Sequence, residues 1–235
     1  DVLSIIEDER DAIDLRRYAG RLLADELDQP DDAIYHFQRA LSVDPENIDI
    51  LERLEDLYRR VAGWPELAQT LHARIELSID PDEKIQLWRK LGEVYEEQLS
   101  EIDQAIMCYE QIISLDETDL LALESLERIY ETYARWEDLI DILRQKVNST
   151  YDPEMIIDIR HRIAIVYEEQ LNDPSRAIGA YSDLLANEQG HMPSLEALER
   201  LYSANAQWDD VLEVLNRQLQ AVFEPDQQVL FDGKL

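Results

Sequence analysis

The sequence holds few of the residues that build disulfides, sheets and membrane spans. Its 235 residues include one cysteine, six glycines and eight prolines. The single cysteine, Cys108, excludes an internal disulfide framework and is compatible with a reducing compartment. No stretch approaches the roughly 18 apolar residues that a membrane helix needs, and the opening DVLSIIEDER lacks the pattern of a signal peptide. The composition therefore favours a helical protein, and its location leans to the cytoplasm.

Basic residues are also scarce, and this limits the classes of partner. There are 22 lysines and arginines against 53 aspartates and glutamates, which gives a formal net charge of −31. Nucleic acids and anionic membranes bind to cationic surfaces, so both are excluded as partners. The acidity fits either a cationic partner or saline surroundings, and the sequence leaves these two explanations open.

Patterns that carry catalysis or hold metals are missing as well. The chain has no HExxH, G-x-S-x-G, GxGxxG, Walker or EF-hand pattern. Its histidines, at positions 36, 72, 161 and 191, fall at unrelated positions, whereas a zinc site needs about four converging ligands. We therefore expect no catalytic residue, no cofactor and no metal, and we predict that the protein is not an enzyme.

What the chain does contain is a repeat of 72 residues. AGWPELAQTLHARIE at 62–76 returns as ARWEDLIDILRQKVN at 134–148 and as AQWDDVLEVLNRQLQ at 206–220. The same shift aligns YEEQL at 95–99 with YEEQL at 167–171. Pairs of an acidic residue and proline recur at the same shift and mark the expected boundary before a new helix. They are Asp80-Pro81, Asp152-Pro153 and Glu224-Pro225. Periodicity of this kind predicts stacked structural repeats.

Each repeat divides into two helical hairpins. In LLALESLERIYETYA, at 120–134, Leu123, Leu126 and Tyr130 recur at helical spacing. Alternating strand patterns are absent, so the predicted fold class is all-α. The expected hairpins occupy residues 9–45, 46–80, 81–117, 118–152, 153–189 and 190–224.

The sequence resembles the tetratricopeptide repeat (TPR) family, in which two antiparallel helices of about 34 residues carry W-x2-L-G-x2-Y, then Ala and an aromatic residue. The matching residues are Trp88, Leu91, Gly92, Tyr95, Ala105 and Tyr109, with one extra residue between the helices. In the adjoining hairpin, Glu127 stands where the family has a small residue. The resemblance implies a right-handed α-solenoid of about six stacked antiparallel hairpins.

The recurring tryptophans, Trp64, Trp136 and Trp208, are expected to begin the second helix of every second hairpin. Their predicted role is structural, because a large ring can fill the gap between neighbouring hairpins. Residues 226–235 align with 82–91, and residues 2–6 align with the end of a Trp-led helix. We therefore expect partial flanking repeats at 1–8 and 225–235, in a segment of a longer array.

Partner-binding residues are expected on the first helix of each hairpin, which lines the concave face in the family that the sequence resembles. The predicted set is Arg17, Arg21, Glu52, Asp56, Arg59, Arg60, Arg89, Glu93, Glu96, Glu97, Glu124, Arg128, Glu131, His161, Glu168, Glu169, Glu196 and Arg200. Its bases gather in the N-terminal third, which is expected to take acidic groups. A solvated acidic face that binds nothing also fits these positions.

The predicted function is a non-catalytic protein–protein interaction scaffold that holds a protein or peptide of basic or mixed charge. The alternative is a regulatory or sensory arm of a larger multidomain enzyme. The oligomeric state stays open.

Overall fold

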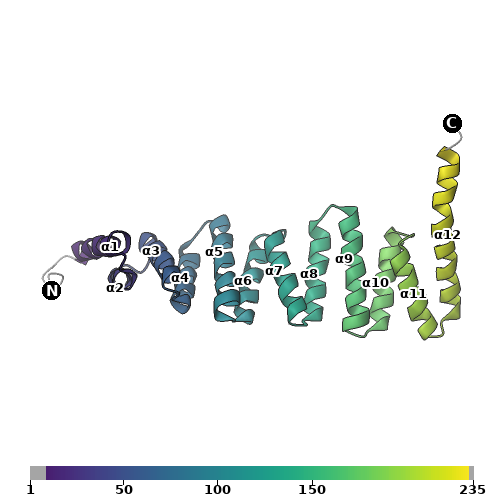
Figure 1. The fold of residues 1–235 in the computed structure, drawn as a ribbon, viewed down its shortest axis with the longest axis horizontal. Coiled ribbons are helices and arrows are strands. Elements are labelled where there is room, and N and C mark those ends of the chain that lie inside the picture. Colours follow the sequence, from purple (N-terminus) through teal and green to yellow (C-terminus); the bar gives the residue numbers. More distant parts are fainter. Residues whose placement is uncertain (1–8, 233–235) are drawn as a thin grey trace. The chain divides into compact units, whose positions relative to one another are not determined.

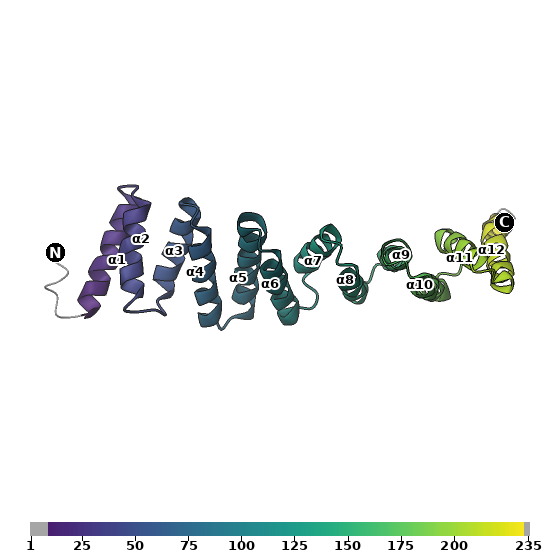
Figure 2. The same cartoon turned by 90° about the horizontal axis from the view of Figure 1, so that it is seen from below.

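The computed structural model describes the backbone of residues 9–232 and the side chains of residues 12–222. These residues form helices and connecting turns, without a strand (Figures 1 and 2). The α-helices are α1 (Glu9–Asp25), α2 (Pro30–Leu41), α3 (Ile48–Arg60), α4 (Trp64–Leu77), α5 (Pro81–Glu93), α6 (Ile102–Leu115), α7 (Leu120–Thr132), α8 (Trp136–Ser149), α9 (Pro153–Ile165), α10 (Pro174–Asn187), α11 (Met192–Ala204) and α12 (Trp208–Asp232). The predicted all-α solenoid of helical hairpins is confirmed.

Two π-helical turns extend the first helices α5 and α9. They are η2 (Val94–Leu99) and η3 (Val166–Gln170), and they coincide with the two YEEQL segments of the sequence. A π turn holds one residue more than an α turn. The extra residue that separates this sequence from the TPR pattern is therefore accommodated at the end of the first helix.

The chain divides into two compact units, residues 1–122 and 123–235. In the first unit, Phe37, Leu54 and Leu71 belong to one buried cluster. In the second unit, Leu126 and Leu143 are equally buried. Each unit thus has its own apolar core between its hairpins, which is what a repeat needs to be stable.

The starts of α5 and α9 follow from the acid–proline pairs. The side chain of Asp80 accepts the backbone N–H of Asp82 at 3.0 Å, and that of Asp152 accepts the N–H of Glu154 at 3.0 Å. Proline follows each aspartate in the first turn, where its missing N–H leaves no hydrogen bond unmade. The two predicted helix boundaries are confirmed.

The third acid–proline pair behaves differently. α12 is continuous from Trp208 to Asp232, so the backbone has no break at 224–225. Residues 225–232 therefore extend α12 instead of forming the separate flanking helix that we expected, and residues 1–8 lie outside the described residues. Position 224 carries Glu, which caps helices less well than the Asp of the earlier copies.

Small residues on the first helices let aromatic rings of the second helices approach closely. A Cβ added at Gly20 would lie 2.8 Å from the ring of Phe37, and one added at Gly92 would lie 3.0 Å from the ring of Tyr109. The corresponding position in the next copy is held by Ala164, which is fully buried. These positions set the distance between the two helices of α1–α2 and α5–α6.

The recurring tryptophans begin α4, α8 and α12, as predicted. Their expected burial is only partly right. Trp64 and Trp136 are half-buried, but Trp208 is 62% exposed. A ring at the start of a second helix is covered only where a following helix packs over it, and α12 has no such neighbour within the described residues.

Candidate partner-binding surface

All the residues predicted to bind a partner lie on the first helices or on the π turns that extend them. The first unit carries Arg17 and Arg21 on α1, Glu52, Asp56, Arg59 and Arg60 on α3, Arg89 and Glu93 on α5, and Glu96 and Glu97 on η2. The second unit carries Glu124, Arg128 and Glu131 on α7, His161 on α9, Glu168 and Glu169 on η3, and Glu196 and Arg200 on α11.

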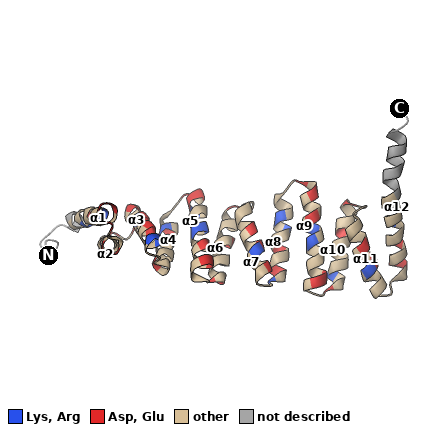
Figure 3. Ribbon diagram, viewed as in Figure 1, with Lys and Arg blue, Asp and Glu red and all other residues tan. Residues whose placement is uncertain are grey.

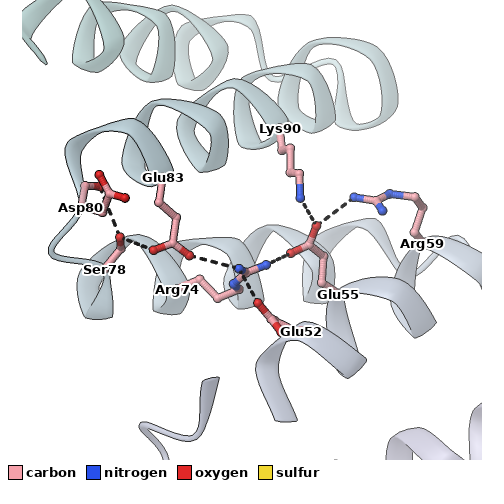
Figure 4. A network of polar contacts seen from close by, with 8 residues as sticks. All are labelled: Glu52, Glu55, Arg59, Arg74, Ser78, Asp80, Glu83 and Lys90. Carbon is pink, nitrogen blue, oxygen red and sulfur yellow. Dashed lines mark hydrogen bonds and ion pairs between the residues drawn. The ribbon is translucent and has the colours of Figure 1, made fainter. Parts of the chain in front are cut away.

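A buried carboxylate organises the charges in the first unit. Glu55 of α3 has a side chain only 4% exposed. It accepts hydrogen bonds from Arg74 of α4, from Lys90 of α5 at 2.7 Å and from Arg59 at 3.1 Å (Figure 4). One glutamate thereby joins three helices.

The same arginine extends the network to further acids. Arg74, whose side chain is 10% exposed, also donates to Glu52 at 3.0 Å and to Glu83 at 3.3 Å (Figure 4). Ser78 donates to Glu83 at 2.6 Å and so connects the network to the loop before α5. A guanidinium can satisfy several carboxylates at once because its five N–H groups point in fixed directions.

The second unit repeats this arrangement 72 residues later. Glu127 accepts from Lys146 of α8 at 2.5 Å and from Arg162 of α9. Arg162 also donates to Glu131 at 2.9 Å. The two cations have exchanged places between the copies. Arg74 of the first unit corresponds to Lys146 of the second, and Lys90 corresponds to Arg162.

A third copy of the contact is uncharged on one side. Glu199 of α11 accepts from the side-chain amide of Gln218 of α12 at 3.0 Å. Gln218 occupies the position of Arg74 and Lys146. Sequence reasoning missed this set, although the 72-residue register of its acids and bases could have shown it.

The cations hold the buried Glu55 and the half-buried Glu127 in the ionised form. Burial by itself pushes the pKa of Glu55 up, but the hydrogen bonds and charges of Lys90 and Arg74 outweigh it, so the pKa lies below the ordinary value. The pKa of Glu127 is lowered in the same way, where Lys146 and Arg162 outweigh the desolvation. These carboxylates are therefore charged at neutral pH.

Two of the predicted acids are tied to the fold by tyrosines. Tyr109 donates its hydroxyl to Glu96 at 3.2 Å, and Tyr181 donates to Glu168 at 3.1 Å. Burial and the nearby Glu168 carboxylate raise the pKa of Tyr181. Glu96 and Glu168 therefore help to hold a second helix against a first helix.

Most of the predicted arginines already have carboxylate partners within the chain. The pairs are Arg17 with Asp49 at 2.7 Å, Arg59 with Glu55, Arg60 with Asp28 at 2.6 Å, Arg89 with Asp119 at 2.6 Å, and Arg200 with Glu168. Several of these pairs join successive hairpins. The basic N-terminal third that was expected to take acidic groups is thus largely neutralised by the protein itself.

Two hollows open on the first helices. One of about 440 Å³ is lined by Ala24, Asp25, Arg53, Asp56, Leu57, Arg59 and Arg60 in the first unit. Another of about 300 Å³ is lined by Glu124, Glu127, Arg128, Glu131 and Lys146 in the second unit. The structure therefore brings together three predicted residues in each hollow, adds Arg53 and Lys146, and leaves Arg17 and Arg21 outside.

The histidines and the cysteine give no metal or nucleophile site among the described residues. No group of three or more His, Cys, Asp or Glu side chains converges there. His161 and His191 do meet, with ring centroids 5.0 Å apart, which their positions in the sequence did not suggest. Burial raises the pKa of the Cys108 thiol to about 12, so this thiol stays protonated and packs as an apolar group.

Known repeat sequences match three parts of the chain. Sequence models described as tetratricopeptide repeat match residues 85–119, 122–154 and 194–229. These segments correspond to α5–α6, α7–α8 and α11–α12. The chain belongs to the tetratricopeptide repeat family. Its protein-interaction scaffold is thus built from TPR hairpins. None of the described helices is long and apolar enough to cross a membrane.

The solved structures that the chain is similar to are distant in sequence. MamA, known from a crystal structure, has 16% sequence identity to this chain. The match covers 80% of this chain and 95% of MamA, with a TM-score of 0.40. YrrB, described as a TPR protein with an unusual peptide-binding site, is 15% identical, with coverage of 81% and 97% and a TM-score of 0.42. A tetratricopeptide repeat protein from Parabacteroides merdae is 12% identical, with coverage of 89% and 79% and a TM-score of 0.44. No curated protein sequence matches the chain.

Three glutamates of the first helices are a departure from the TPR pattern. Glu55, Glu127 and Glu199 stand at the position where a TPR first helix carries a small residue. In the alternate hairpins that position holds Gly20, Gly92 or Ala164, and at the two glycines it admits an aromatic ring. Every second TPR hairpin thus carries a hydrogen-bonded glutamate at this position, paired with cations at Glu55 and Glu127 and with an amide at Glu199.

Proposed function

We propose that the protein is a non-catalytic scaffold whose first-helix surface binds a protein or peptide segment of basic charge, or of mixed charge with basic groups in contact. The first-helix surface comprises the predicted partner-binding residues given above.

The observation that carries this proposal is the unequal pairing of the two charges. The arginines of the surface lie mostly in ion pairs with the chain's own carboxylates, whereas several acids of the surface do not. Glu97, Glu124 and Glu196 are exposed and have no hydrogen-bond or ion-pair partner among residues 12–222. Figure 3 shows that acids lie along the helices of both units. Unpaired carboxylates attract cationic groups of a partner and raise its rate of association.

The test uses three synthetic peptides of equal length, acetylated and amidated, that alternate Leu with Lys, Gln or Glu. Fluorescence anisotropy measures their binding to the full chain and to two triple variants. The first variant is Glu97→Gln, Glu124→Gln and Glu196→Gln. The second, the matched control, is Glu76→Gln, Asp138→Asn and Glu213→Gln, which changes the net charge equally on the second helices.

We expect the Lys peptide to bind best and to lose about tenfold in affinity with the first variant, since three exposed ion pairs contribute together about 1–2 kcal/mol. The control should change the affinity less than about twofold. Equal losses in both variants would reduce the interaction to the general field of a chain with net charge −31, and the proposed surface would be wrong. Added salt should weaken the binding of the Lys peptide.

A further inference from the structure

Besides the two hollows on the first helices, the second unit contains a hollow lined by arginines and apolar side chains, outside the first-helix surface. It measures about 790 Å³, which is within the range of about 300–1,000 Å³ of ligand sites. Its walls come from α8, α9 with η3, and α10, and they include Arg144, Arg160, Arg176 and Gly179. We call this hollow the arginine groove. None of the residues lining it belongs to the predicted partner-binding set.

The groove exists because four residues changed between the copies of the repeat. The corresponding positions in the first unit carry His72, Trp88, Met107 and Cys108, and here they carry Arg144, Arg160, Gly179 and Ala180. In the first unit the rings of His72 and Trp88 contact each other edge to face, with centroids 5.7 Å apart. In the second unit, therefore, two rings are replaced by arginines, and two larger side chains by small ones.

Gly179 shows that the space is not needed for packing. A Cβ added to this residue would meet no atom within 4 Å, in contrast to Gly20 and Gly92. Glycine inside a helix lowers stability by about 0.5–1 kcal/mol relative to alanine. No contact of the described residues offsets this loss, so the open space itself is the only evident gain.

The three arginines of the groove differ in their partners. Arg176 lies over the ring of Tyr167, 4.7 Å from its centroid, and pairs with Glu137 and Asp173. Arg144 donates to the hydroxyl of Tyr167 at 2.8 Å and to Asp141 at 3.2 Å.

Arg160 is different, because it is half-buried and has no hydrogen-bond or ion-pair partner among residues 12–222. A guanidinium in that position is a ready donor for a carboxylate, which it can bind through two parallel hydrogen bonds. Asp183 is the only acidic residue among those that line the groove.

We propose that the arginine groove binds an acidic peptide segment of a partner protein, in which an Asp or Glu side chain pairs with Arg160. Next to it an apolar side chain fills the space over Gly179 and Ala180, against Ile163 and Leu184. This site goes beyond the proposed function, because it uses other residues and selects the opposite charge.

The charge complementarity is local. The chain as a whole repels acidic peptides, so only a site with an unpaired cation can retain one. The groove offers such a cation beside an apolar floor, and this combination determines the occupant: an acidic residue adjacent to Leu, Ile or Phe.

The test uses the alternating Leu–Glu peptide and the Leu–Gln peptide described above, with the full chain. Two variants restore residues of the earlier copy: Gly179→Met fills the groove, and Arg160→Trp removes its free cation. Gly179→Met replaces a helix-breaking residue by a helix former in open space, so it preserves folding, which circular dichroism verifies.

We expect the Leu–Glu peptide to bind at least about tenfold more tightly than the Leu–Gln peptide, a difference that corresponds to one charge-assisted pair. Both variants should lose that binding, while the triple variant on the first helices keeps it. Equal binding of the two peptides, or full binding to Gly179→Met, would overturn the proposal. The Lys peptide reports separately on the proposed function, since neither groove variant should change its affinity.

Discussion

The repeat copy in α3–α6 and the copy in α7–α10 keep one set of contacts and change another. Glu55 and Glu127 each hold two cations from the following helices, and the hydroxyls of Tyr109 and Tyr181 each reach a glutamate of a π turn. The space around Trp88 in the first unit, by contrast, becomes the arginine groove in the second.

The two copies show which contacts of the repeat can change. A buried carboxylate cannot lose its cations without leaving a desolvated charge unpaired, so its partners can only be exchanged, as arginine and lysine are here. A ring pair at the surface between hairpins has no such constraint. Its replacement by arginine and glycine leaves the core intact and creates a recognition site.

The largest effect is expected from removing Glu55 or Glu127. Glu55→Ala leaves Arg74 almost fully buried without its closest partner, and it should lower the free energy of unfolding by about 3–5 kcal/mol. Glu127→Ala should cost less, about 1.5–3 kcal/mol, because the side chain of Glu127 is 14% exposed and that of Arg162 is 37% exposed.

Urea unfolding and amide hydrogen exchange in α3–α5 and α7–α9 measure these two losses. Glu213→Ala serves as the exposed control and should stay within about 0.5 kcal/mol of the parent chain. A larger loss for Glu127→Ala than for Glu55→Ala would contradict the burial argument.

The three recurring tryptophans should differ in their contribution to stability. Trp64→Ala and Trp136→Ala remove half-buried rings and should each lower the free energy of unfolding by about 2–3 kcal/mol, somewhat less than for a fully buried ring. Trp208→Ala should cost below about 1 kcal/mol because its ring is mostly exposed. Thermal and urea unfolding of the three variants rank them, and equal losses at all three positions would show that Trp208 is covered in solution.

Two glycines should respond to alanine with opposite signs. Gly92→Ala places a methyl group 3.0 Å from the ring of Tyr109 and should destabilise the first unit by about 1–3 kcal/mol. Gly179→Ala meets no atom and should stabilise α10 by about 0.5–1 kcal/mol. Unfolding free energies give both signs directly, and a loss of stability for Gly179→Ala would contradict the open space of the groove.

The pH dependence of stability tests whether Glu55 is ionised when folded. Its pKa in the folded chain lies below the ordinary value, so its stabilising contribution is complete above about pH 4.3 and is lost as the pH falls through the folded-state pKa. Glu55→Gln should therefore be less stable than the parent chain at pH 7 and should approach it at pH 3. A stability difference that does not change with pH would mean that the buried group is already protonated. Glu127→Gln should behave in the same way.

The smallest effect concerns a histidine pair that only the second unit contains. Burial and then the charge of His191 lower the pKa of His161, against the opposing effect of Asp158. Because the folded chain disfavours the protonated form, this residue's contribution to stability is present above about pH 6.5 and declines as the pH falls through the lower folded-state pKa.

His191→Gln should therefore move the pKa of His161 back towards its ordinary value. The pKa of His36 in the first unit, which burial and Arg16 lower, should not change in this variant. Proton NMR titration of the imidazole signals measures both. An unchanged pKa of His161 would show that burial alone sets it.

Much of the fold was predictable from local pattern. The helical spacing of Leu123, Leu126 and Tyr130, the cap at Asp80 and the tryptophan at the start of α4 act over a few residues, so a single stretch of sequence is enough to recognise each. The continuous α12 was not predicted, because a weak cap competes with the helix that precedes it. The half-exposed tryptophans were misjudged because burial depends on the next helix.

The residues predicted to bind a partner lie on the first helices or their π turns, as the helical spacing indicated. The partners of the charges on these helices come from residues 19 and 35 positions away, such as Arg74 and Lys90 for Glu55. Amphipathic spacing within one helix gives no sign of them. The same holds for Arg160. Its lack of a partner among the described residues could be recognised only after the packing of α8, α9 and α10 was known.

Composition and short-range spacing are enough to predict the 72-residue period, the helical hairpins and the acidic character of the chain. Only the packing of the hairpins shows which charges are buried and satisfied, which carboxylates and arginines stay available, and where a groove opens. The physical reason is that desolvation and pairing depend on distances between side chains of different helices, and these distances are set only when the hairpins pack.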